Sequence, residues 1–161
     1  MKFFKGTIAA LMGILAISAA IAGGHGIEIR DPWIREAPPV TKVLAAYMTL
    51  ENHSDQPLTI TDSSSPAFER VEIHKSEMRA GMARMKHQKN LEIPPHGRVE
   101  LKPGGYHLML MGRKHPLHAG DKVEITLGFS DGTRMTATAE VRKDMPGKHG
   151  AMDHSKHGMK H

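Results

Sequence analysis

Two residue types that bind soft metals are unusually abundant in this sequence. It contains 12 histidines and 12 methionines in 161 residues, and no cysteine. Imidazole binds copper in either oxidation state, and thioether ligands favour Cu(I). The absence of cysteine excludes disulfide frameworks, cysteine zinc sites, iron–sulfur clusters, thiol nucleophiles and blue-copper centres. The composition therefore points to copper bound through histidine and methionine.

The segment 104–112 has the most informative spacing. Successive side chains of a β-strand alternate between faces, so His107, Met109 and Met111 would share one face. The two intervening leucines would supply the opposite, apolar face. Side chains two residues apart on a strand are separated by about 6.6 Å and can converge on one ion. A methionine stripe commonly packs in a core, but the histidine at its start favours a ligand face.

A second segment upstream shows a related pattern. Val71 and Ile73 would face inward, which turns His74 outward. The stretch 78–85 then places three methionines, the last being Met85, among arginine, glycine and alanine, which is not a core composition. Imidazoles combined with thioethers and no clustered carboxylates argue against zinc, iron, calcium and magnesium. We therefore expect a Cu(I) site that combines both segments.

The spacing of these residues resembles the H-x10-M-x21-H-x-M signature of the PCu(A)C family of periplasmic copper chaperones. In this sequence the four positions are His74, Met85, His107 and Met109. The resemblance extends to 33–39, 45–52 and 101–106, and it covers about residues 27–142.

This resemblance implies a cupredoxin-like Greek-key β-barrel that binds one Cu(I) through His74, Met85, His107 and Met109. It also implies delivery of copper to the copper-bearing subunit of cytochrome c oxidase during assembly, alone or with a Sco-type thiol protein. Some members of the family carry a His/Met-rich C-terminal extension that binds further copper, often Cu(II).

The pattern of short apolar runs independently predicts an all-β domain over residues 23–142. The predicted strands are 27–30, 43–50, 71–74, 99–101, 123–127 and 135–141, together with the segment 104–112. Proline, glycine and serine clusters separate them, as in a β-sandwich or barrel.

The N-terminus has the features of an export signal. Two lysines precede an apolar run and small residues, so we expect a signal peptide at 1–22 and a periplasmic location rather than an uncleaved anchor. Without a cysteine, we do not expect a lipoprotein.

Cleavage before Gly23 would leave Gly23, Gly24 and His25 at the mature start. A free amine, two amides and an imidazole suit square-planar Cu(II) or Ni(II), so this is a second, hypothetical site.

The last 19 residues, 143–161, have too few aliphatic side chains to form a core, so we expect disorder without metal. Their metal-binding side chains would hold additional Cu(II) or Cu(I). These candidates are His149, Met152, His154, His157, Met159 and His161.

The remaining histidines have less informative contexts. His53, His96, His115 and His118 lie in turns or loops and are expected to be solvated. His87 follows Met85 by two residues and could lie near the site or across the strand from it. The net charge of +5 is spread along the chain and aromatics make up only 4%, which argues against nucleic-acid binding.

The sequence favours a copper chaperone over two alternatives. A copper-resistance protein of the CopC type would share the β-barrel and the ligand types. An enzyme is disfavoured because no HExxH, G-x-S-x-G or phosphate-binding glycine motif occurs. We expect a monomer that binds no nucleic acid and has no stable membrane association after signal cleavage.

Overall fold

The computed structural model describes residues 26–143, which form ten β-strands. The strands are β1 (Ile27–Arg35), β2 (Val43–Asn52), β3 (Leu58–Ser64), β4 (Phe68–Arg79), β5 (Met82–Gln88), β6 (Leu91–Ile93), β7 (Arg98–Leu101), β8 (Tyr106–Arg113), β9 (Lys122–Phe129) and β10 (Arg134–Arg142). Within this range no helix is long and apolar enough to cross a membrane. The expected signal peptide at 1–22, the start at 23–25 and the tail ligands from His149 onward lie outside the described residues.

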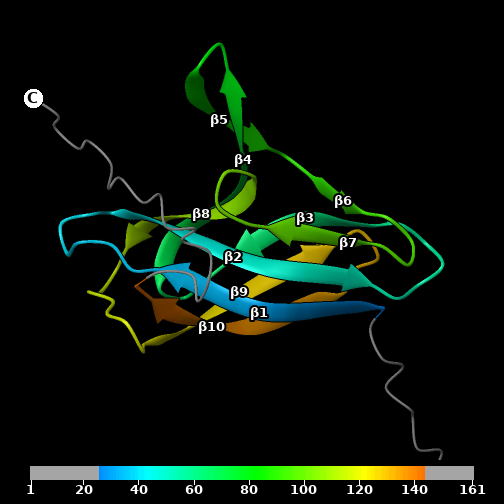
Figure 1. The fold of residues 1–161 in the computed structure, drawn as a ribbon. Helices are drawn as coiled ribbons and strands as arrows, with labels where there is room; N and C mark the ends of the chain where they lie inside the picture. The colour runs from blue at the N-terminus through cyan, green and yellow to red at the C-terminus, as the bar shows by residue number, and fades with distance from the viewer. Residues whose placement is uncertain (1–25, 144–161) are drawn as a thin grey trace, which may run out of the picture.

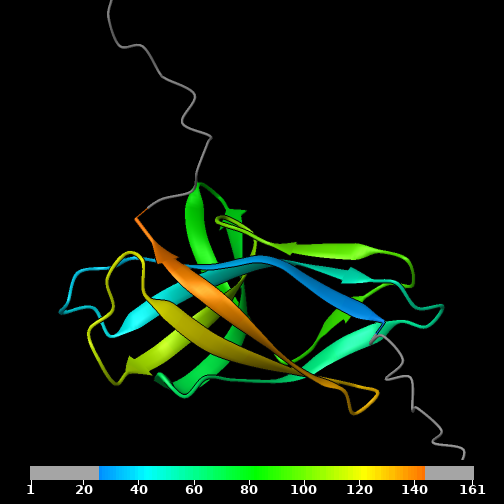
Figure 2. The ribbon, with the colours of Figure 1, turned by 90° about the horizontal axis from the view of Figure 1, so that it is seen from below.

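The strands join in one curved sheet that wraps around a single core (Figure 1). Its order is β5-β4-β8-β7-β2-β1-β10-β9-β3-β6, with an additional pairing of β8 with β2. β1, β10 and β9 lie side by side on one wall of the barrel (Figure 2). The all-β prediction is confirmed. Three strands were not predicted from the sequence: β3, β5 and β6.

Strand alternation places the core as expected for β4 and β8. Leu108 and Leu110 are fully buried, and Val71 and Ile73 pack in the same core cluster. Burial of a leucine of this kind contributes about 1.5–3 kcal/mol relative to exposure. The opposite faces of β4 and β8 are thereby turned outward. The core thus determines the direction in which the predicted ligands on β4 and β8 point.

A β-bulge in β1 determines which of its side chains face outward. The register with β2 shifts between Arg30 and Trp33, and Asp31 has a positive φ of 43°. The extra residue reverses the alternation, so Trp33 lies opposite Tyr47 rather than pointing to the barrel interior. The outward face of β1 and β2 therefore carries polar residues at one end and an aromatic pair at the other.

β4 and β5 form a hairpin whose far end projects from the barrel (Figure 1). Two residues, Ala80 and Gly81, connect the strands, with φ angles of 51° and 76°. Two consecutive positive φ angles are typical of the tight turn whose twist matches that of paired strands. This turn sets the register in which His87 lies opposite His74.

Candidate metal centre

Two of the predicted ligands, His74 and His107, lie directly opposite each other on neighbouring strands. β4 and β8 are antiparallel, and these two residues are register partners. Their ring centroids are 6.0 Å apart. Thirty-three positions separate them in the chain, so the pairing of β4 with β8 is what brings the imidazoles together.

The hydrogen bonds of each ring indicate which nitrogen is available to a metal. The Nε2 of His74 lies 2.9 Å from a carboxylate oxygen of Glu72, and its buried Nδ1 has no hydrogen-bond partner among the described residues. Nδ1 of His107 lies 3.2 Å from the carbonyl oxygen of Gly105. These contacts assign the proton to Nε2 of His74 and to Nδ1 of His107. A lone pair therefore remains on Nδ1 of His74 and Nε2 of His107.

The surroundings keep His107 in the neutral form that binds metals. The residue is only 5% exposed, and this burial lowers the pKa of His107. The hydrogen bond from His74 also lowers the pKa of the Glu72 carboxyl, which favours its charged form. A carboxylate behind an imidazole is the usual outer partner of a metal-binding histidine, since it fixes the tautomer and the ring orientation.

The two predicted methionines border one open pocket of about 270 Å³ together with His107. Met109 follows His107 on the outward face of β8, and Ala45 lies opposite it on β2. The small alanine side chain leaves space in front of the thioether. Met85 comes from β5 and is 65% exposed. Three of the four predicted ligands therefore meet at this pocket, and the fourth, His74, is the strand partner of His107.

A row of aromatic rings crosses the outward face at the level of the histidines. Trp33 and Tyr47 have ring centroids 4.7 Å apart, and the Tyr47 and His107 centroids are separated by 6.5 Å. The row continues through His74 to His87, whose centroids are 5.5 Å apart. Burial raises the pKa of Tyr47 and so keeps the phenol protonated. His107 therefore lies in the middle of this row, with Tyr47 on one side and His74 on the other.

His87 is the residue at this site whose position the sequence left open. It is the register partner of His74 on β5, so its ring lies on the same outward face. The signal that could have identified it was the tight hairpin at Ala80 and Gly81, which fixes the pairing of β4 with β5.

The other candidate residues of the described range either have different partners or are exposed away from this site. Met111 shares the outward face of β8 but receives a contact of 3.4 Å from Arg70 to its sulfur. His96 lies 2.7 Å from a carboxylate oxygen of Asp55. His115 and His118 are exposed in the connection between β8 and β9.

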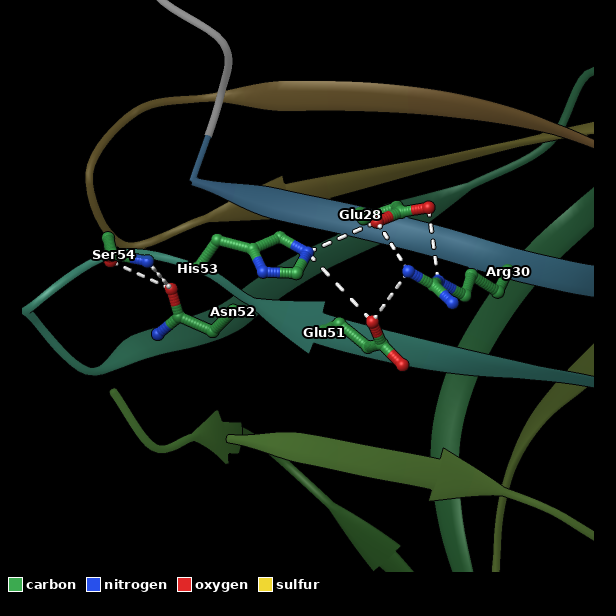
Figure 3. Close-up of polar contacts among 6 residues, drawn as sticks. All are labelled: Glu28, Arg30, Glu51, Asn52, His53 and Ser54. Carbon is green, nitrogen blue, oxygen red and sulfur yellow. Dashed lines mark hydrogen bonds and ion pairs between the residues drawn. The ribbon is translucent and has the colours of Figure 1, made fainter. Parts of the chain in front are cut away.

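A second cluster lies near the other end of β2 (Figure 3). Ligand atoms of Glu28, Glu51 and His53 lie within 4.8 Å of one another. Arg30 contacts one oxygen of each glutamate at 3.0 Å, and the imidazole of His53 lies 3.1 Å from Glu28. Arg30, followed by His53, lowers the pKa of Glu28. The guanidinium bridges the two carboxylates, offsets one of their two negative charges and occupies the position that a cation would take.

Comparison with known proteins identifies the family. A family model described as LpqE-like matches residues 27–141. The protein Lxx21020 of Leifsonia xyli is 32% identical over 123 residues, which span 76% of this chain and 72% of the relative. RP573 of Rickettsia prowazekii is 32% identical over 124 residues, 74% of this chain and 68% of the relative. The family and the Leifsonia protein carry a lipoprotein description, and none of the 161 residues here is a cysteine.

Solved structures share the fold. The copper-bound PCuAC domain from PmoF2 matches with a TM-score of 0.63 and 27% identity over 74% of this chain and 94% of that domain. The Cu(I) form of DR1885 from Deinococcus radiodurans matches with a TM-score of 0.62 and 36% identity, over 81% of this chain and 89% of DR1885. The cupredoxin-like fold expected from the signature is confirmed. The chain belongs to the LpqE-like family, and its fold is that of the PCuAC domains.

Proposed function

We propose that this chain is an exported copper chaperone that binds Cu(I) through His74, Met85, His107 and Met109. The observation that carries the proposal is the pairing of His74 with His107 beside a pocket that both methionines border. Two neutral imidazoles and two thioethers form a soft donor set without acidic ligands, which suits a monovalent copper ion. Similarity to the copper-bound PmoF2 domain and to Cu(I)-DR1885 supports the choice of metal.

The site combines protection with access, as transfer requires. His107 is buried at the base, whereas Met85 is exposed on the projecting hairpin. A partner could displace the exposed thioether first and take the ion by stepwise ligand exchange. We propose the copper-bearing subunit of cytochrome c oxidase as recipient, alone or with a Sco-type thiol protein. We also propose that the tail, 143–161, holds further copper outside the barrel.

Anaerobic Cu(I) competition titration tests the ligand set. Met109→Ala should weaken Cu(I) binding by more than about tenfold. Loss of a residue that only hydrogen-bonds to a metal ligand can already cost that much, so loss of a ligand should cost more. Its control is Met111→Ala, which removes a thioether from the same face of β8. Met85→Ala and Met82→Ala form a second pair on β5, since Met82 is also exposed but pairs with Arg79. Equal losses within each pair would contradict the assignment.

Transfer and physiology test the role. Cu(I)-loaded protein should metallate the copper-bearing domain of the oxidase subunit, and X-ray absorption should count two sulfur and two nitrogen ligands before transfer. Loss of the protein should lower oxidase activity when copper is scarce. Sensitivity only to excess copper would instead indicate a resistance protein of the CopC type.

A further inference from the structure

We propose that His87 joins His74 and His107 to form a three-imidazole site for Cu(II) on the face that also binds Cu(I). This inference rests on the proposed copper function and adds a second oxidation state to the same site. It concerns a residue that lies outside the four-position signature, and its argument depends on strand register.

The three histidines occupy one level on three adjacent strands. His74 on the middle strand pairs with His87 on β5 and with His107 on β8. The ring of His74 lies 5.5 Å from that of His87 and 6.0 Å from that of His107, measured between centroids. Strands are spaced by about 4.8 Å. Within residues 26–143 only Glu28, Glu51 and His53 already have their ligand atoms within 4.8 Å of one another, so the two outer imidazoles must lean toward the middle strand to bind one ion.

The outer histidines differ in freedom of movement, which suits one fixed and one adjustable ligand. His107 is buried and held by the carbonyl of Gly105. His87 is exposed, and within residues 26–143 no hydrogen bond or ion pair engages its imidazole. Between them, the unpartnered buried Nδ1 of His74 is a nitrogen acceptor without a proton donor. A bound metal ion would take the lone pair of this nitrogen.

Ligand preference distinguishes the two oxidation states at this face. Cu(II) favours tetragonal sites of nitrogen and oxygen donors, whereas thioethers favour Cu(I). Three imidazoles with one water molecule form such a nitrogen and oxygen set. The methionines border the pocket from β5 and β8 and remain available to Cu(I). His87 should therefore contribute more to Cu(II) binding than to Cu(I) binding.

The experiment uses the full mature chain with competing histidines removed. Its background carries His25→Ser, His149→Ser, His154→Ser, His157→Ser and His161→Ser. One equivalent of Cu(II) is added, and pulsed electron paramagnetic resonance counts the bound imidazoles. We expect three in this background and two after His87→Ala. The Cu(II) dissociation constant should rise about tenfold or more, and the ratio of Cu(II) to Cu(I) affinity should fall.

Two control variants make the result decisive. His96→Ala removes an exposed histidine outside the row and should leave three imidazoles on the ion. His53→Ala tests the cluster of Glu28, Glu51 and His53, and it should also have no effect. An unchanged signal in His87→Ala, or loss of Cu(II) in His53→Ala, overturns the inference. Failure of the background protein to bind Cu(I) would instead overturn the proposed function.

Discussion

The outward face of β2 borders two histidine-containing clusters that differ in their readiness to bind a cation. At one end Ala45 faces Met109, and the imidazoles of His74 and His107 lie beyond it. At the other end Glu51 belongs to the cluster with Glu28 and His53. Glu51 lies six positions after Ala45, which is about 20 Å along a strand.

The clusters differ in how their donor atoms are used. Near Glu51, Arg30 supplies the positive charge, and the carboxylates and the imidazole already contact one another. At the His74 end the hydrogen bonds occupy one nitrogen of each ring and leave the other with a lone pair. Proximity of suitable residue types is therefore insufficient, because a metal needs donor atoms that no internal cation has taken.

The largest expected effect comes from removing His74, and removal of His53 from the other cluster is its control. His74→Ala should weaken Cu(I) binding by about a hundredfold or more. The variant removes a proposed ligand whose ring the hydrogen bond to Glu72 already orients. His53→Ala should leave Cu(I) affinity unchanged. Competition titration of both variants measures the contrast. Similar losses in the two would show that the clusters do not differ as we argue.

A stability effect should appear at the other end of β2. Asn52 is buried, its amide donates to the carbonyls of Gln56 and Ile93, and its oxygen accepts from the backbone and hydroxyl of Ser54 (Figure 3 draws the Ser54 contacts). Asn52→Ala should lower the free energy of unfolding by about 2–3 kcal/mol, because buried groups lose their partners.

Chemical denaturation measures this loss, with Ser54→Ala as the control. That variant removes only the hydroxyl and should cost about 1 kcal/mol. Cu(I) affinity should remain unchanged in both variants. A weaker Cu(I) site in folded Asn52→Ala protein would mean that the two ends of β2 are coupled.

A smaller effect on Cu(I) affinity is expected from the carboxylate behind His74. Glu72→Gln keeps the shape and an acceptor oxygen but removes the negative charge that supports the imidazole. Affinity should fall by about tenfold. Glu28→Gln is the matched change in the other cluster and should have no effect on Cu(I) titration. A Glu72→Gln protein with full affinity would remove Glu72 from the site.

The smallest effect concerns acid stability. The folded pKa of Glu28 lies below its ordinary value of 4.5 because of Arg30 and then His53, so its stabilising contribution exists above that value. It is lost as the pH falls through the folded pKa. Glu28→Gln should therefore be less stable than the wild type at pH 7 and equally stable in strong acid. Urea unfolding at several pH values measures the difference, and a gap that widens on acidification would contradict it.

Much of the fold was predictable because apolar alternation marks strands with one buried face. The leucines of β8 and the valine and isoleucine of β4 indicated which side chains face outward. β5 gave no such signal, since its residues from Met82 to His87 are exposed on both sides and backbone pairing with β4 holds it in place. The bulge in β1 was also unforeseen, because one extra residue reverses the facing of Trp33 without changing the local composition.

For this protein, the order of residues alone was enough to propose a soft donor set and to predict the two strand faces that carry His74, His107 and Met109. Strand alternation and ligand chemistry act locally, so spacing along the chain expresses both. Which strands become neighbours, and at what register, depends on pairing between distant segments and on packing of the whole core. The tertiary structure therefore decided that His74 lies opposite both His107 and His87, and that Arg30 bridges the two carboxylates of the other cluster.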